Sequence, residues 1–138
     1  MVKAIIRDPE FLRQPSPEAE RTDLQVGRDL CDTLSAHRGE CVGMAANMIG
    51  VRRRVIVMNP GLGPFNVVMY NPVIVRKEKP YMTEEGCLSL PGTRKTERFQ
   101  EIEVEFRDAQ WEMHRMSFSG FPAQIIQHEV DHLNGILI

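Results

Sequence analysis

The sequence predicts an α+β fold, and three observations carry this prediction. Short runs rich in β-branched residues occupy the middle of the chain, a strictly alternating segment follows them, and a helical pattern closes the C-terminus. Strands that precede a closing helix favour an α+β arrangement over an alternating parallel sheet. The chain has 138 residues, the length of one ordinary domain, so we expect residues 1–138 to form a single domain.

The N-terminal half is expected to contain an irregular arm and one helix. Residues 8–20 include three prolines and are typical of an extended arm. Residues 22–39 carry small and apolar residues at spacings of three and four, which predicts an amphipathic helix capped by Thr22 or Asp23. The residues with this spacing are Leu24, Gly27, Cys31 and Leu34.

Strands are predicted at residues 55–58 and 66–75, where β-branched residues are concentrated. Residues 101–106 alternate, so the apolar side chains of Ile102, Val104 and Phe106 should face inward and the glutamates between them should face water. A turn at 108–110 would bring residues 111–118 back as a partner strand.

A final helix is predicted from Gly120 and Pro122 to Gly135, since proline suits a first turn and glycine a helix end. Polar residues at spacings of three and four draw one stripe down this helix: Gln124, Gln127, Asp131 and Asn134.

The same helix carries the pattern His-Glu-x-x-His. Positions i and i+4 lie on one face of a helix, so His128 and His132 can point at one metal ion. Glu129 lies about 100° round the helix from His128, where it can reach a water molecule held by the ion. Two ligands and one proton-moving carboxylate predict a hydrolytic metal site.

A third ligand must come from upstream, because the tail after His132 offers only the amide of Asn134. The candidates are Cys87, His114, His37, Cys41, Cys31 and the upstream carboxylates. Cys87 has the most suitable setting: Gly86 allows close backbone approach, and Pro91-Gly92 is expected to end any strand, so a rigid turn would present the thiolate. An odd number of cysteines argues against a disulfide framework.

Three segments in the right order resemble the peptide deformylase family: "VGMAANMIG" at 42–50, "EGCLS" at 85–89 and "QHEVDHLNG" at 127–135. The resemblance implies an α+β fold with small, mostly antiparallel sheets packed around a C-terminal metal-binding helix. It implies that Cys87, His128 and His132 hold one divalent metal ion. Fe²⁺ is expected, and Zn²⁺, Ni²⁺ or Co²⁺ can substitute for it.

The implied activity removes the N-formyl group from N-formylmethionyl peptides and releases formate. By resemblance, Glu129 takes a proton from the water held by the ion and donates one to the leaving amine. The Leu88 N–H helps to stabilise the oxyanion. The implied partners are N-formylmethionyl nascent peptides, with the ribosome as one place to meet them.

The resemblance also assigns the substrate side of the site. Val42 and Gly43 would pair with the peptide as an added strand, Phe121 and Ile125 would line an apolar pocket for methionine, and Arg94 would border it. Glu85 would pair with Arg98 as a brace.

Met48 departs from the family pattern, which has a glutamine at this position. Methionine offers no N–H to an oxyanion, and the neighbouring Asn47 is expected on an extended strand with its side chain on the opposite face. Two hypotheses stay open: a slower or retuned deformylase, or a homologue that binds metal and peptide in a regulatory or other non-deformylase role.

Cys41 also replaces a glycine, and should narrow the groove or bring a second thiol near the metal. A cysteine hydrolase with Cys87 as nucleophile is a third hypothesis, although it leaves Glu129 without a role.

Composition limits the partners. Apolar residues make up 42% and charged residues 26% of the chain, and the formal net charge is −2 with both signs interspersed. A nucleic-acid footprint would show clustered Lys and Arg, so no direct nucleic-acid contact is expected. No apolar run has the length of a membrane span and no secretory pattern opens the chain, so we expect the cytoplasm, or an organelle whose targeting segment is absent here.

Overall fold

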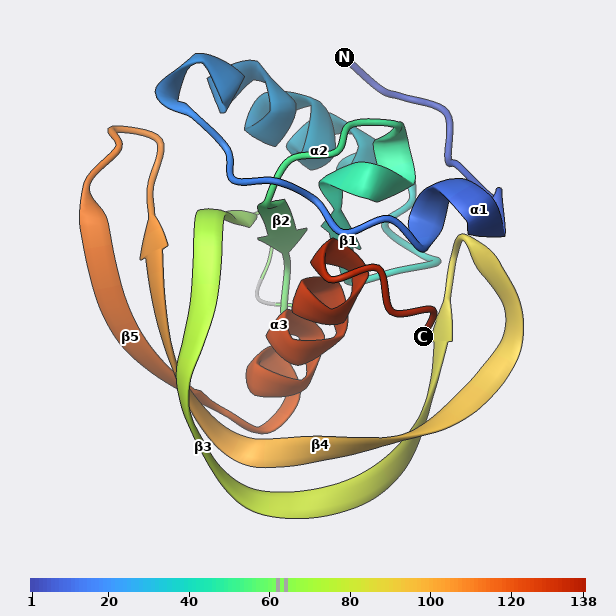
Figure 1. Ribbon diagram of the computed structural model, residues 1–138, viewed down its shortest axis with the longest axis vertical. Coiled ribbons are helices and arrows are strands. Elements are labelled where there is room, and N and C mark those ends of the chain that lie inside the picture. Colours follow the sequence, from blue (N-terminus) through green and yellow to red (C-terminus); the bar gives the residue numbers. More distant parts are fainter. Residues whose placement is uncertain (62, 64) are drawn as a thin grey trace.

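Five strands form one antiparallel sheet in the computed structural model, which describes residues 1–61, 63 and 65–138 (Figure 1). The sheet order follows the chain: β1 (Gly43–Ala45), β2 (Val55–Met58), β3 (Val67–Cys87), β4 (Leu90–Arg107) and β5 (Met113–Ser119). The strands predicted at 55–58, 66–75, 101–106 and 111–118 are all present. However, β3 and β4 extend far beyond their predicted ranges.

The helices are α1 (Pro9–Leu12), α2 (Leu24–Ala36) and α3 (Gly120–Leu133). Two 3₁₀ turns accompany them: η1 (Arg21–Asp23) precedes α2, and η2 (Ala46–Ile49) lies between β1 and β2. The predicted α+β class is confirmed, with the strands in one sheet rather than several small ones. Among the described residues, no helix combines the length and the apolar character needed to cross a membrane.

The predicted arm at 8–20 contains one helical turn. The carboxylate of Asp8 accepts a hydrogen bond from the Glu10 N–H at 3.0 Å and so caps α1. Asp23 precedes α2 as predicted, but its carboxylate accepts from the Glu20 N–H before the helix rather than from α2 itself.

The long strands β3 and β4 curve beneath α3, and the tip of their hairpin rises beside α1 (Figure 1). Shifts in register between Tyr70 and Val73, and between Ile74 and Arg76, interrupt the pairing, and such bulges bend a sheet. The predicted alternation in β4 is confirmed, because Ile102, Val104 and Phe106 are buried while the glutamates between them are partly exposed.

The expectation that Pro91-Gly92 ends a strand was wrong, since β4 begins at Leu90 and runs through both residues. Gly86 pairs with Thr93 but Cys87 pairs with Leu90, so Pro91 and Gly92 form a bulge. A bulge accepts proline because no ladder hydrogen bond is required from it. Cys87 therefore ends β3 and is followed by a two-residue link, Leu88-Ser89.

The polar stripe of α3 faces the sheet and fixes the helix on it. Gln124 donates to a Glu85 carboxylate oxygen at 2.8 Å, and Asp131 accepts from Arg98 at 2.7 Å. The Gln127 amide accepts from the Phe99 N–H and donates to the Phe99 carbonyl, both at 2.8 Å. These bonds set the rotation of α3, and with it the direction of the residues on its other face.

The end of α3 is held by the N-terminal arm. The Ser16 N–H donates to the Leu133 carbonyl at 2.8 Å, and Arg54 donates to the same carbonyl at 3.2 Å. Gly135 follows the helix with a φ of 77°, as a helix-ending glycine does, and a Cβ at this position would lie 2.2 Å from the Arg13 carbonyl oxygen.

We expect Gly135→Ala to destabilise the protein by about 2–5 kcal/mol, from positive-φ strain of about 1–2 kcal/mol and a backbone collision of about 1–3 kcal/mol. Gly120→Ala is the matched control, because Gly120 has a φ of 64° but open space around its Cβ position, so it should show the strain alone. Urea unfolding measures both variants, and equal losses would contradict the arm contact.

Candidate metal centre

Three side chains from distant parts of the chain converge in one place. The Sγ of Cys87, at the end of β3, lies 3.3 Å from Nε2 of His132, which lies 3.2 Å from Nε2 of His128. Bonds of about 2.0–2.3 Å to a tetrahedral ion would separate such donors by about 3.3–3.6 Å. The Cys-His-His set therefore fits a divalent metal ion with these ligand types.

The other upstream histidines and cysteines are not part of this cluster in the described part of the chain. His37 pairs with Glu40 after α2, at 2.8 Å, and His114 pairs with Asp108 across the β4–β5 turn, at 2.6 Å. Cys31 packs against the core. Cys41 lines the cavity beside the centre, and burial raises the pKa of its thiol to about 12.

A buried carboxylate orients the first imidazole. Oε1 of Glu85 lies 2.9 Å from Nδ1 of His128, which leaves Nε2 free to ligate. The predicted pairing of Glu85 with Arg98 is present, with donor–acceptor distances of 2.7 and 3.0 Å. Burial opposes the charge of Glu85, but hydrogen bonds from His128, Arg98 and Gln124 lower its pKa to about 2.

The two imidazoles differ in protonation. Burial and the neighbouring His128 lower the pKa of His132 to about 3, so its ring is neutral, as a ligand must be. Burial also acts against charge on His128, but the charge of Glu129 and the hydrogen bonds to Cys87 and Glu85 raise its pKa to about 10. A metal ion at His128 would therefore compete with a proton.

Glu129 is only 4% exposed and lies against β1. Burial raises its pKa to about 7, which suits a group that takes up and returns a proton near neutral pH. Its Oε1 is buried and has no hydrogen-bond partner in the described part of the chain. Gly43 makes this placement possible, because a Cβ there would lie 2.8 Å from Oε2 of Glu129.

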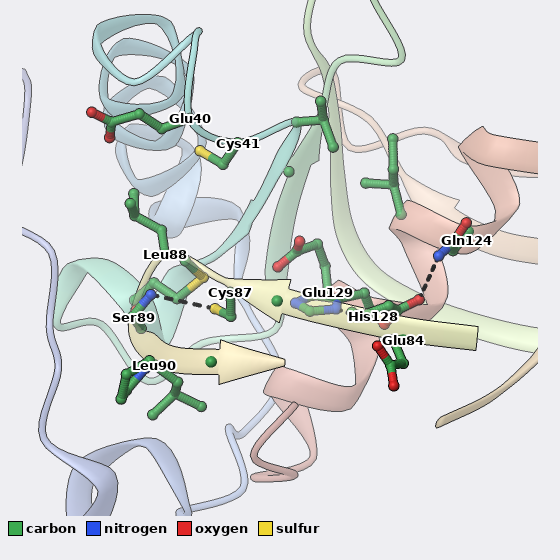
Figure 2. Close-up of a pocket in the computed structure, with 18 of the residues that line it drawn as sticks. Glu40, Cys41, Glu84, Cys87, Leu88, Ser89, Leu90, Gln124, His128 and Glu129 are labelled. Carbon is green, nitrogen blue, oxygen red and sulfur yellow. Dashed lines mark hydrogen bonds and ion pairs between the residues drawn. The ribbon is translucent and has the colours of Figure 1, made fainter. Parts of the chain in front are cut away.

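The centre opens into a cavity of about 1020 Å³ (Figure 2). The predicted site residues that line it include Val42, Gly43, Met48, Glu85, Leu88, Phe121 and Ile125. Arg94 lies outside the cavity wall that the described residues form, and donates to the Pro91 carbonyl at 3.1 Å. Its contact with substrate stays a prediction.

Met48 is in η2 rather than on the extended strand expected for this segment. Its side chain is 1% exposed, and its sulfur accepts from the Ala45 N–H at 3.5 Å. Asn47 does not supply the missing donor, because it is fully buried, is not among the described residues that line the cavity, and donates its amide to the His132 carbonyl at 2.9 Å. Asn47 instead helps to hold the end of the ligand helix.

Sequence reasoning missed several contacts around the centre. Gln124 holds Glu85 from α3, and the Ser89 N–H donates to the Cys87 sulfur at 3.5 Å (Figure 2). Arg7 donates to the Leu88 carbonyl at 2.6 Å from the N-terminal arm. The stripe containing Gln124 was a visible signal, but nothing in the sequence linked Arg7 to a turn 81 positions later.

The chain resembles known proteins in both sequence and fold. A sequence model of the family described as polypeptide deformylase matches residues 2–138. The peptide deformylase of Clostridium beijerinckii (strain ATCC 51743 / NCIMB 8052) is 53% identical over 138 residues, which cover 100% of each chain. Two solved structures of a class I type b peptide deformylase from Acinetobacter baumannii both have TM-scores of 0.87. The actinonin-bound one is 33% identical and covers 99% of this chain and 95% of its own. The Met-Ala-Ser-bound one is 32% identical and covers 99% and 97%.

We expect Glu85→Gln to flatten the acid side of the stability curve of the metal-free protein. Because the folded pKa of Glu85 lies below the usual 4.5, its ionisation stabilises the fold above pH 4.5, and this contribution, on the order of 3 kcal/mol, is lost as the pH falls towards 2. Urea unfolding at pH 7, 4.5 and 3 measures how steeply the free energy of unfolding changes with pH. The exposed neighbour Glu84, as Glu84→Gln, is the control and should keep the wild-type slope. Equal slopes in all three proteins would contradict the assignment.

Proposed function

Since the chain belongs to the polypeptide deformylase family, which is a family of enzymes, we propose that it removes the formyl group from N-formylmethionyl peptides and releases formate. The observation that carries this proposal is the meeting of Cys87, His128 and His132 beside the buried carboxyl of Glu129, next to a cavity that Cys87, His128 and Glu129 line. The Met-Ala-Ser peptide bound to the Acinetobacter baumannii relative supports a peptide as the ligand.

Cys87, His128 and His132 would hold the ion. When bound, a divalent ion would act as a Lewis acid that lowers the pKa of a water molecule to near 7 and makes it a usable nucleophile. Glu129, which lines the cavity, would accept a proton from the attacking water. As the bond between the formyl carbon and the amide nitrogen breaks, Glu129 would return the proton to the leaving nitrogen, so that formate and a free amine result.

The oxyanion would be stabilised in part by the Leu88 N–H, which follows Cys87 directly in the link between β3 and β4. The position of Leu88 in the cavity wall supports this role. Met48 can donate no hydrogen bond, so the Leu88 N–H and the ion would share the task.

The peptide would lie along β1. Among the strands that the described residues form, this strand is at the edge of the sheet and pairs with β2 alone, so its other side would offer backbone groups to an added strand. Val42 and Gly43 would supply that pairing. The side chains of Phe121 and Ile125, on the α3 side of the cavity, would form the apolar wall for methionine.

The wider assignment follows from the same activity. We propose one divalent ion per chain, with Fe²⁺ expected and Zn²⁺, Ni²⁺ or Co²⁺ as substitutes. Nascent N-formylmethionyl peptides would be the substrates, in protein biosynthesis in the cytoplasm, with residues 1–138 acting as one domain.

A second candidate function rests on Met48. Its thioether lines the cavity where the family pattern has a hydrogen-bond donor, so a weakened homologue that binds metal and peptide in a regulatory or other non-deformylase role is the alternative. The cysteine hydrolase fits less well, because Cys87 shares its site with two imidazoles and Glu129.

In metal-loaded protein, Glu129→Gln should lower formate release from an N-formylmethionyl peptide by at least about 10², because the proton-moving carboxyl is lost. Metal content should stay at the wild-type level, whereas His132→Ala should lose metal as well. A formate-release assay with parallel metal analysis separates these outcomes. Wild-type protein with full metal content and no formate release would exclude the deformylase proposal.

Met48→Gln should raise formate release by about 10² or more if the missing donor is the only loss, since one oxyanion donor contributes roughly 10²–10³ in rate. Met48→Leu is the control, because it keeps an apolar side chain without a donor and should leave the rate near wild type. An unchanged rate in Met48→Gln would favour the second candidate, in which the groove itself has changed.

A further inference from the structure

Arg7 reaches the candidate metal centre from outside the three motif segments, 42–50, 85–89 and 127–135. Its Nη1 donates to the Leu88 carbonyl at 2.6 Å, and its side chain lines the same cavity as Glu129. Figure 1 shows the corresponding arrangement of the chain, with the tip of the β3–β4 hairpin beside α1. A positively charged group is therefore bonded to the link that follows Cys87.

The peptide unit between Leu88 and Ser89 connects Arg7 to the sulfur. Its carbonyl accepts from Arg7, and its N–H, which belongs to Ser89, donates to Sγ of Cys87 at 3.5 Å (Figure 2). Hydrogen bonds to a charged donor are stronger than neutral ones, and bonds in series polarise one another. A charged donor on this carbonyl would therefore strengthen the N–H···S bond and restrain the link in which Leu88 lies.

The backbone on both sides of Arg7 is held in place. The Ile6 N–H donates to the Met48 carbonyl at 2.8 Å, which joins the arm to η2. On the other side, Asp8 caps α1 through the Glu10 N–H. These two contacts fix the point from which the Arg7 side chain extends, so its bond to Leu88 costs little additional ordering of the chain.

We propose that Arg7 is a positioning residue for the metal centre, which holds the Cys87 sulfur through the Leu88-Ser89 peptide. The proposal rests on the proposed function in one respect, that Cys87 is a metal ligand. It goes beyond that function because it assigns a role to a residue of the N-terminal arm, and because it concerns metal affinity rather than the reaction.

The test uses Co²⁺-loaded protein and does not depend on turnover. Arg7→Met should weaken Co²⁺ binding by about 10-fold, since loss of a residue that supports a ligand typically costs 10–100-fold in affinity. The sulfur-to-cobalt absorption band should shift as well, because the N–H···S bond weakens. Arg7→Lys should recover part of the affinity, since it keeps a charged donor. Competition with a chelator gives the affinities, and absorption spectra give the band.

Arg13→Met is the matched control, because Arg13 is an exposed arginine on the same arm, outside the cavity wall, and its replacement changes the net charge equally. Its affinity and spectrum should equal those of the wild type. The proposal would be overturned if Arg7→Met kept the Co²⁺ affinity and absorption band of the wild type. It would also be overturned if Arg13→Met weakened Co²⁺ binding as much as Arg7→Met.

A purely structural role is tested by circular dichroism of Arg7→Met and Arg7→Gln, and loss of the fold in both would also overturn the proposal. Wild-type protein that binds no Co²⁺ would remove the proposed function together with this inference. Wild-type binding with unaffected Arg7 variants would remove this inference alone.

Discussion

The buried ion pair between Glu85 and Arg98 is the interaction on which the site depends. Arg98 is 4% exposed, and its guanidinium binds Glu85 on β3 and Asp131 on α3 while it extends from β4. Glu85 in turn orients His128. A charge buried this deeply destabilises the fold unless it is fully paired. The pairing is complete only when β3, β4 and α3 are correctly placed relative to one another. The convergence of Cys87 with the two imidazoles follows from that placement.

Much of the site could be predicted because its chemistry is local in the sequence. The spacing of His128 and His132 on a helix is enough to place both on one face, and the glycine beside Cys87 indicates close packing. The alternation at 101–106 likewise predicts one buried face for β4. These features depend on periodicity, which a single sequence displays directly.

The remainder depends on tertiary contacts that leave no local pattern. Pro91 and Gly92 signal a break, but the pairing of β3 with β4 absorbs both residues as a bulge and continues. Asn47 and Met48 suggest an extended segment, but η2 turns there, and Asn47 bonds to the end of α3. Arg7 meets Leu88 only after the N-terminal arm has packed beside the hairpin. In each case the packed chain, rather than the local preference, decides the conformation.

The edge position of β1 has a consequence for how widely the protein could act. Strand addition at Val42 and Gly43 would rely on main-chain amides and carbonyls, which are the same in every polypeptide apart from proline's missing N–H. Beyond the first side chain, recognition of this kind depends little on the sequence of the peptide. An enzyme built on such an edge would accept peptides of many different sequences in one groove.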